Sequence, residues 1–221
     1  MIALELPRTD KLDVLCLGAH CDDIEIGCGG TILHLLQRSP KPSVRWVVFC
    51  SNRERRAECE KSAERFLGKG SKPRIFEFRD GFLPYNGGAV KEQFEELKRE
   101  LKPDLILTHF RNDRHQDHRL VCELTWNTWR DHMIWEYEIP KYDGDLGAPN
   151  LFVPLGEDDV ETKLRHVIEC YGSQHSRQWF DRETLLGLMR LRGVEANAPG
   201  RYAEAFYTPK LVVDPSRAGK G

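Results

Sequence analysis

Short apolar runs alternate with longer amphipathic segments along most of the chain. The apolar runs predict strands at residues 12–18, 44–50, 74–78, 104–109 and 134–139. The amphipathic segments predict helices at residues 31–38, 55–67, 90–101, 118–130, 158–171 and 184–191. Glycine and proline in residues 142–154 predict a surface loop, and the end of the chain predicts a last edge strand at 210–213 and a frayed tail at 216–221.

This alternation predicts one α/β domain over residues 1–221, with a Rossmann-like, doubly wound and mainly parallel sheet. The run VRWVVFC at residues 44–50 is β-branched and continuous, as expected for a strand buried on both faces. In the strand order 3-2-1-4-5, the first and fourth strands are neighbours at the switch point. Open α/β sheets bind ligands there, outside the carboxyl ends of the strands.

Polar residues follow these two strands. The segment AHCDD, residues 19–23, comes directly after the first, and HFRNDRHQDH, residues 109–118, comes after the fourth. The two segments are far apart in the sequence and meet only if the sheet is wound as predicted. We therefore expect the candidate functional site at this edge of the sheet.

Three of these residues have the side chains of an open metal site. His20 and Asp23 are spaced to reach one ion from a loop that enters a helix, and His118 would supply a third ligand. Two histidines and a carboxylate that leave one position to water are typical of catalytic zinc, although Fe²⁺ or Co²⁺ would fit the same donors. Such an ion lowers the pKa of its water toward about 7.

Three further residues predict amide hydrolysis at that ion. Asp22 is placed to take the proton from the water, and His115 to protonate the leaving nitrogen or stabilise the oxyanion. Asp117 would orient the His115 ring. Each motif alone has a simpler explanation, because aspartates often cap helices and histidines in loops are often only solvated. Their joint position after strands one and four favours the functional interpretation.

Composition narrows the class of protein. The formal net charge of -2 gives no attraction to nucleic acid or to anionic membranes, and no apolar run is long enough to span a bilayer. The first residues, MIALELPRTDKLD, lack the apolar core of a signal peptide, so we expect a cytoplasmic protein. Seven cysteines without a C-x-x-C pair predict reduced thiols.

The block AHCDDIEIGCGGTI, together with RHQDH, resembles the PIG-L/LmbE-like N-deacetylases. These are zinc-dependent enzymes that remove acetyl groups from N-acetylglucosamine-type sugars in glycoconjugates, and their motifs are A-H-P-D-D and H-x-D-H. The resemblance implies His20, Asp23 and His118 as metal ligands. It also implies Asp22 as the base, and His115 with Asp117 as the acid or oxyanion pair.

Two further features belong to this resemblance. Arg56 lies in a segment like the family's R-x-E helix, whose arginine faces the substrate. Cys21 replaces the family's proline, and Ile24 stands where glutamate is frequent, but neither change removes a ligand. The resemblance implies an N-acetylated amino sugar as substrate and leaves its carrier open, whether a lipid, a thiol-forming glycoside, a nucleotide sugar or an antibiotic.

Two other functions stay open. Residues 24–30, IEIGCGG, resemble the E-x-G-x-G turn of S-adenosylmethionine-dependent methyltransferases. That interpretation requires a first strand at residues 20–26 and an acid after the second strand, and FCSN at 49–52 has none. A non-catalytic sugar- or nucleotide-binding module would use the same scaffold, but binding alone gives no reason for a base beside three metal ligands.

Weaker signals concern the substrate and partners. Lys141 and Tyr142 follow the fifth predicted strand and are expected to contact sugar hydroxyls. Arg53 and Arg55 could meet a phosphate or carboxylate, or only form a solvated helix start. Four aromatic residues are expected to pack in the core, with a sugar platform or a homo-oligomer contact as the alternatives: Trp126, Trp129, Trp135 and Tyr137.

Overall fold

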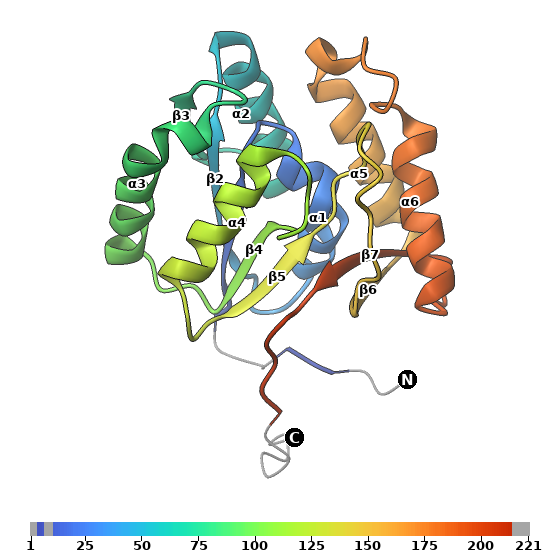
Figure 1. The fold of residues 1–221 in the computed structure, drawn as a ribbon. Coiled ribbons are helices and arrows are strands. Elements are labelled where there is room, and N and C mark those ends of the chain that lie inside the picture. The colour runs from blue at the N-terminus through green and yellow to red at the C-terminus, as the bar shows by residue number, and fades with distance from the viewer. Residues whose placement is uncertain (1–3, 7–10, 214–221) are drawn as a thin grey trace.

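In the computed structural model, which describes residues 4–6 and 11–213, seven strands form one sheet in the order β3-β2-β1-β4-β5-β7-β6 (Figure 1). They are β1 (Asp13–Gly18), β2 (Ser43–Cys50), β3 (Arg74–Phe78), β4 (Leu105–His109), β5 (Met133–Tyr137), β6 (Leu151–Leu155) and β7 (Tyr202–Tyr207). Strands β1 to β5 are parallel, β7 is antiparallel to β5, and β6 is antiparallel to β7. The predicted order 3-2-1-4-5 is confirmed, and two antiparallel strands extend it.

Helices cover both faces of this sheet, as Figure 1 shows. They are α1 (Asp23–Leu35), α2 (Arg53–Leu67), α3 (Gly87–Glu100), α4 (Gln116–Thr128), α5 (Glu157–Cys170) and α6 (Arg182–Glu195). Apolar side chains of α1, α2, α5 and α6 pack in one core cluster, and those of α3 and α4 pack in another. Since both faces of the central strands are buried, their sequences are nearly continuous apolar runs.

Helix α1 starts at Asp23, well before the predicted start at residue 31. The glycines at its beginning allow a close approach to the sheet, because a Cβ atom at Gly27 would lie 2.1 Å from the Tyr137 ring. The helix is interrupted at Cys28 (φ -145°, ψ 17°). Beyond this kink, the carboxylate of Glu204 in β7 accepts hydrogen bonds from the amides of Gly30 and Thr31, at 2.8 and 2.6 Å.

The predictions for the last third of the chain need correction. Strand β6 (Leu151–Leu155) begins inside the predicted loop 142–154 and ends one residue after it, and β7 was not predicted. The predicted edge strand at 210–213 is wrong, since its apolar residues Leu211, Val212 and Val213 are 42–87% exposed and have no strand beside them among the described residues. The predicted tail at 216–221 lies outside the described residues. The other helices and strands are found with ends shifted by a few residues.

The aromatic residues near β5 pack in the core, as predicted. Trp129, Trp135 and Tyr137 are buried, and the indole of the half-buried Trp126 donates a hydrogen bond to Glu136 at 2.7 Å. All seven cysteines are free and buried. No helix in the described ranges combines the length and the apolar composition that crossing a bilayer requires.

Candidate metal and catalytic site

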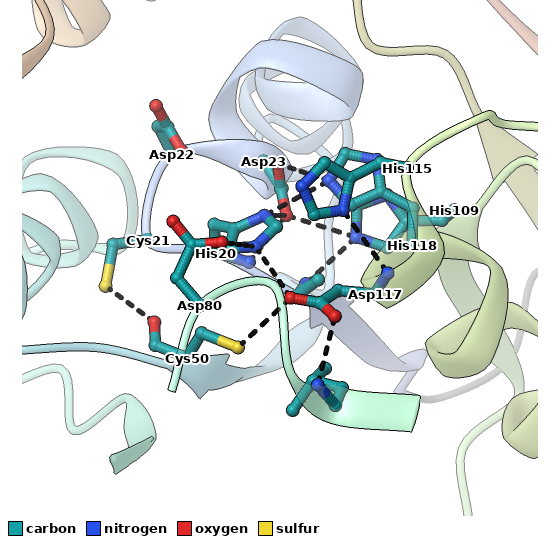
Figure 2. A network of polar contacts seen from close by, with 12 residues as sticks. His20, Cys21, Asp22, Asp23, Cys50, Asp80, His109, His115, Asp117 and His118 are labelled. Carbon is teal, nitrogen blue, oxygen red and sulfur yellow. Dashed lines mark hydrogen bonds and ion pairs between the residues drawn. The ribbon is translucent and has the colours of Figure 1, made fainter. Parts of the chain in front are cut away.

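The polar residues that follow β1 and β4 meet at the carboxyl ends of these strands, as the switch-point argument predicts (Figure 2). His20 lies in the short connection between β1 and α1, and Asp23 is the first residue of α1. His118 lies in the first turn of α4, although it is 98 residues from His20 in the sequence. The parallel pairing of β1 with β4 is what brings these segments together.

The three predicted metal ligands have donor atoms that converge. His20 Nδ1 lies 3.1 Å from His118 Nε2. His20 Nδ1 is 3.4 Å from Asp23 Oδ2, and His118 Nε2 is 3.4 Å from the other oxygen, Asp23 Oδ1. Ligand atoms about 2.0–2.1 Å from a tetrahedral zinc ion are about 3.3 Å apart. The donor types and spacings therefore fit a divalent metal ion with these three ligands.

The charges around the donors favour a cation. Burial alone would raise the pKa of Asp23, but the neighbouring rings of His118 and His109 hold the pKa well below its ordinary value. Burial likewise opposes protonation of His20, yet the charge of Asp23 keeps the pKa of that imidazole well above its ordinary value. Negative charge on Asp23 and positive charge beside it therefore stabilise each other in this cluster.

Each of the two imidazoles also contacts a carboxylate on its other side. His118 Nδ1 lies 2.9 Å from Asp113 Oδ2, and His20 Nε2 lies 3.0 Å from Asp80 and 3.3 Å from Asp117. Such contacts fix the tautomer and orientation of a ligating histidine. Asp113 and Asp80 were not predicted. For Asp113 the sequence held a signal, since it lies in the same loop as His115.

Asp22 does not cap helix α1, so the simpler explanation of this residue fails. It occupies the N-cap position but its side chain makes no capping hydrogen bond. Figure 2 shows it pointing away from the imidazole rings, whereas Asp23 points among them. Asp22 Oδ1 instead pairs with Arg55 Nη2 at 2.8 Å, and burial raises the pKa of Asp22 against the opposing charge of Arg55.

His115 and Asp117 interact differently from the prediction. The carboxylate of Asp117 accepts the amides of Gly81 and Leu83, at 2.7 and 3.0 Å, and lies beside His20. It is the Asp117 backbone amide that donates to His115 Nδ1, at 3.2 Å, because His115 is the N-cap of α4. Asp117 is therefore placed to orient His20 and the turn after β3. Burial lowers the pKa of His115, and the charge of His118 lowers it further.

Of the three predicted substrate-binding residues, Arg56 and Tyr142 make their contacts elsewhere, and Lys141 lies behind His118. Arg56 Nη2 donates to the Ile75 carbonyl at 2.6 Å, so this side chain lies along β3, and it is the neighbouring Arg55 that pairs with Asp22. The ammonium of Lys141 is enclosed by acceptors of the chain itself. Tyr142 is 67% exposed, with its hydroxyl accepting from the Gln178 amide at 3.3 Å.

His109 at the end of β4 is a further member of the cluster that was not predicted. It is buried, and its Nε2 lies 2.9 Å from the Ala19 amide nitrogen and 3.2 Å from Asp23. Burial lowers the pKa of His109 to about 4, so the ring is neutral. The Cys21 thiol points away from the donors toward the Cys50 carbonyl at 3.5 Å (Figure 2).

The methyltransferase alternative does not agree with the fold. It requires a strand at residues 20–26, but the first strand of the sheet is Asp13–Gly18 and Asp23 already begins helix α1. The glycines of the IEIGCGG segment lie inside this helix and face neighbouring side chains, not a turn around a cofactor.

Comparison with known proteins gives one family match. The family model described as PIG-L, GlcNAc-PI de-N-acetylase, matches residues 15–129. This range contains both polar segments of the candidate site.

Solved structures with a similar fold include two deacetylases and a hydratase. N,N'-diacetylchitobiose deacetylase from Pyrococcus horikoshii has a TM-score of 0.69 and 24% identity, over 88% of this chain and 82% of that chain. GalB, the 4-carboxy-2-hydroxymuconate hydratase from Pseudomonas putida KT2440, has a TM-score of 0.73 and 17% identity, over 94% and 100%. A zinc-inhibited form of teicoplanin deacetylase Orf2 has a TM-score of 0.68 and 15% identity, over 88% and 97%. At these identities the likeness concerns the fold.

Proposed function

Because the chain belongs to the PIG-L family, that of the GlcNAc-PI de-N-acetylases, we propose that it is a metal-dependent hydrolase that removes the acetyl group from an N-acetylated amino sugar. The observation that carries this proposal is the convergence of His20, Asp23 and His118 at metal-ligand spacing, on one edge of the sheet. A module that only binds sugar would not require a base such as Asp22 and a donor such as His115 beside three metal ligands.

His20, Asp23 and His118 would hold the metal ion, which we take to be Zn²⁺, with Fe²⁺ and Co²⁺ compatible with the same donors. When bound, such an ion acidifies water and polarises a carbonyl oxygen. The teicoplanin deacetylase of the same fold was solved in a zinc-inhibited form, which supports a zinc-responsive site in a protein of this fold. Asp113 and Asp117 would keep the two imidazoles in the orientation that the ion needs.

Asp22 is the general base in this proposal. Arg55 holds Oδ1, so Oδ2 is the atom that accepts a proton from the attacking water. The burial that raises the pKa of this carboxylate makes it a better base than an exposed aspartate. As the carbon–nitrogen bond of the amide breaks, this proton becomes available to the leaving nitrogen, and acetate and a free amine result.

His115 acts as a hydrogen-bond donor. Since Nδ1 accepts the Asp117 amide, the ring proton of the neutral imidazole lies on Nε2. A lowered pKa keeps the ring neutral near pH 7, so Nε2–H can donate to the acetyl oxygen as negative charge develops on it. This arrangement favours the oxyanion role of His115 over that of an imidazolium acid.

The family and two neighbours of the same fold support this substrate class. One neighbour is named an N,N'-diacetylchitobiose deacetylase and another a teicoplanin deacetylase, and both names describe the removal of acetyl groups. The fold does not select the reaction by itself, because GalB is a hydratase. We place the enzyme in the cytoplasm, since its cysteines are free thiols.

The test is acetate release from a panel of N-acetylglucosamine compounds that differ in carrier: a phosphatidylinositol glycoside, an aryl glycoside, a nucleotide sugar and diacetylchitobiose. The zinc-loaded protein is compared with protein stripped by a chelator. We expect acetate and free amine in equal amounts from at least one compound. Binding of a compound without acetate release would support the non-catalytic module, and no zinc-dependent release from any compound would overturn the proposal.

A further inference from the structure

A buried cluster of three charged side chains lies behind the metal-ligand candidate His118. Lys141 Nζ lies 2.9 Å from Asp113 Oδ2 and 2.6 Å from Asp145 Oδ2, and the Lys141, Asp113 and Asp145 side chains are only 9%, 3% and 4% exposed. Lys141 and Asp145 belong to the segment between β5 and β6, whereas Asp113 precedes α4. The Asp113–Lys141–Asp145 cluster thus joins two loops at the carboxyl edge of the sheet.

The hydrogen bonds of this cluster use all N–H hydrogens of the Lys141 ammonium, so none is left to donate to a substrate. An ammonium has three N–H hydrogens. Those of Lys141 have three acceptors within the chain, namely Asp113, Asp145 and the Ile139 carbonyl, which is 3.4 Å away. The expectation that Lys141 contacts a sugar is therefore replaced by a role inside the protein.

Asp113 connects Lys141 to His118 and to the backbone of His115. Its Oδ2 is shared by Lys141 and His118 Nδ1, each at 2.9 Å, and its Oδ1 accepts the His115 amide at 2.7 Å. Asp145 makes a matching contact, because its Oδ2 also accepts the Arg114 amide at 2.7 Å. Lys141 is the one cation between these two carboxylates among the described residues.

We propose that Lys141 is a positioning residue for the metal site: it holds the loop of residues 141–150 against the loop before α4 and so fixes the orientation of His118. This rests on the proposed function only in taking His118 as a metal ligand. Without the ammonium, two buried carboxylates would lie close together with no cation between them, and their repulsion would move the loop of residues 141–150 away from Asp113. Loss of such an outer partner typically lowers metal affinity 10- to 100-fold.

If Lys141 acted only through its charge, removing the ammonium would change the zinc affinity in the opposite direction. An ammonium near the ligands repels a metal ion, so its removal would strengthen metal binding if position did not matter. The sign of the change in zinc affinity in Lys141→Met therefore separates the two explanations. Lys141→Met/Asp145→Asn removes one of the facing charges and keeps an oxygen for the Arg114 amide, so it should recover most of the affinity that Lys141→Met loses.

The experiment measures zinc affinity by competition with a chromophoric chelator, and hydrogen exchange of amides 141–150 in metal-free protein. Lys141→Met should bind zinc 10- to 100-fold more weakly and exchange faster in this loop, and Lys141→Arg should stay within a few-fold of wild type. Lys91→Met is the control, since Lys91 pairs with Glu95 on the surface of α3. If Lys141→Met does not fold, Lys141→Gln takes its place, with the same expected direction of change in zinc affinity and in loop exchange.

Zinc binding in Lys141→Met as tight as in wild type, or tighter, would overturn the proposal. A double variant that binds zinc no better than Lys141→Met would also overturn it, and so would unchanged exchange of the loop in Lys141→Met. Neither readout uses acetate release, so a failure of the deacetylase proposal would show separately. If the wild type itself bound no zinc, the exchange of residues 141–150 alone would decide whether Lys141 holds the loop.

Discussion

At the scale of single residues, two adjacent carboxylates have different surroundings. Asp23 lies within 3.4 Å of a nitrogen of both His20 and His118, and Asp22 pairs with Arg55 at 2.8 Å. Helix α1 starts between them, which turns the two side chains in different directions. The difference in surroundings is the basis for giving them separate roles.

Substitution by asparagine tests these roles, because it keeps size and removes charge. Asp22→Asn should keep its zinc and lose on the order of 10² to 10⁴ in kcat, the contribution of a general base. Asp23→Asn should bind zinc more weakly. Metal content and kcat of both variants are the measurements. Loss of metal in Asp22→Asn with retention in Asp23→Asn would exchange the roles, and full activity in both would exclude the mechanism.

Two neighbouring arginines provide a matched pair for a second prediction. Arg55→Gln removes the partner of Asp22 and should lower kcat by about tenfold or more, since a misplaced base loses much of its effect. Arg56→Gln changes a side chain bonded to the Ile75 carbonyl and should stay within about twofold of wild type. The measurement is kcat of both variants from steady-state kinetics at saturating zinc. Equal losses in both variants would contradict the assignment.

Arg55 and Arg56 also show how far a sequence motif can identify the residues of a site. The H-x-D-D and H-x-D-H spacings predict His20, Asp23 and His118 as ligands, and short loops at the ends of adjacent strands bring these side chains together. The resemblance to the family's R-x-E helix pointed to Arg56, but it is Arg55 that pairs with Asp22. Consecutive residues of a helix point about 100° apart, so a shift of one residue changes which surroundings a side chain reaches. Sequence spacing also cannot tell that Asp117 uses its backbone amide for His115.

Glu25 of helix α1 gives a prediction about pH. It is fully buried, and the Tyr171 hydroxyl contacts Oε1. Burial raises the pKa of Glu25 from 4.5 to about 8. Because the pKa is raised in the folded state, the stability that this group contributes is present below pH 4.5 and lost as the pH rises through about 8.

Glu25→Gln should remove this dependence. The free energy of unfolding of the metal-free variant, compared with wild type, should shift in favour of the variant by on the order of 3 kcal/mol between pH 5 and pH 8, at about 1.4 kcal/mol per pKa unit. Urea unfolding at the two pH values measures it. A constant difference between the two proteins would mean that Glu25 does not titrate in this range.

At the scale of elements, helix α1 depends on strand β7, which lies between β5 and β6. Glu204 of β7 accepts two amides beyond the kink in α1 and pairs with the buried Lys163 of α5 at 2.7 Å. Lys163 also donates to the Ile26 carbonyl at 2.6 Å. One carboxylate therefore joins three elements, and α1 is the element that carries Asp23.

Glu204→Gln should destabilise the fold by about 3–5 kcal/mol, because it leaves the Lys163 ammonium buried without a counter-charge. Lys163→Met/Glu204→Gln should recover part of this loss. The surface pair of Arg182 and Glu161, with side chains 49% and 60% exposed, is the control, and Glu161→Gln should change stability by less than about 1 kcal/mol. Urea unfolding of the three variants tests this. A similar cost for Glu204→Gln and Glu161→Gln would contradict the buried role.

The strands that the sequence predicted and those it did not differ in their apolar patterns. Strands β1, β2, β4 and β5 are parallel and largely buried, so their apolar runs identify them. Strand β6 (LFVPL) contains a proline and β7 (YAEAFY) has small residues and a glutamate, and both lie at the antiparallel end of the sheet. The LVV of residues 211–213 has the stronger apolar pattern but no partner strand in the described chain, because pairing depends on tertiary position.

At the scale of the whole molecule, the candidate site depends on the strand order. His20 and Asp23 come after β1 and His118 after β4, and only the crossover that places these strands side by side brings their side chains together. The alternation of strands and helices predicted this order. What it could not predict is the outer set of contacts from Asp80, Asp113 and Arg55, since these depend on loop conformations that no periodicity encodes.

A metal ion at this site would connect two distant segments of the chain, so it should stabilise the fold as a whole. An ion that binds the folded state alone adds about 2.7 kcal/mol at a free concentration of 100 times its Kd. For a domain of this size, that raises Tm by roughly 5–10 °C. Thermal unfolding with chelator and with added Zn²⁺ measures the shift.

His118→Ala should lose most of the zinc-dependent rise in Tm, because it removes the ligand that comes from α4. His132→Ala is the matched control, since His132 pairs with Asp131 ahead of β5, apart from the cluster. A rise in both variants as large as in wild type would mean that zinc binds elsewhere. No rise in wild type would remove the metal from the mechanism, even if acetate release were observed.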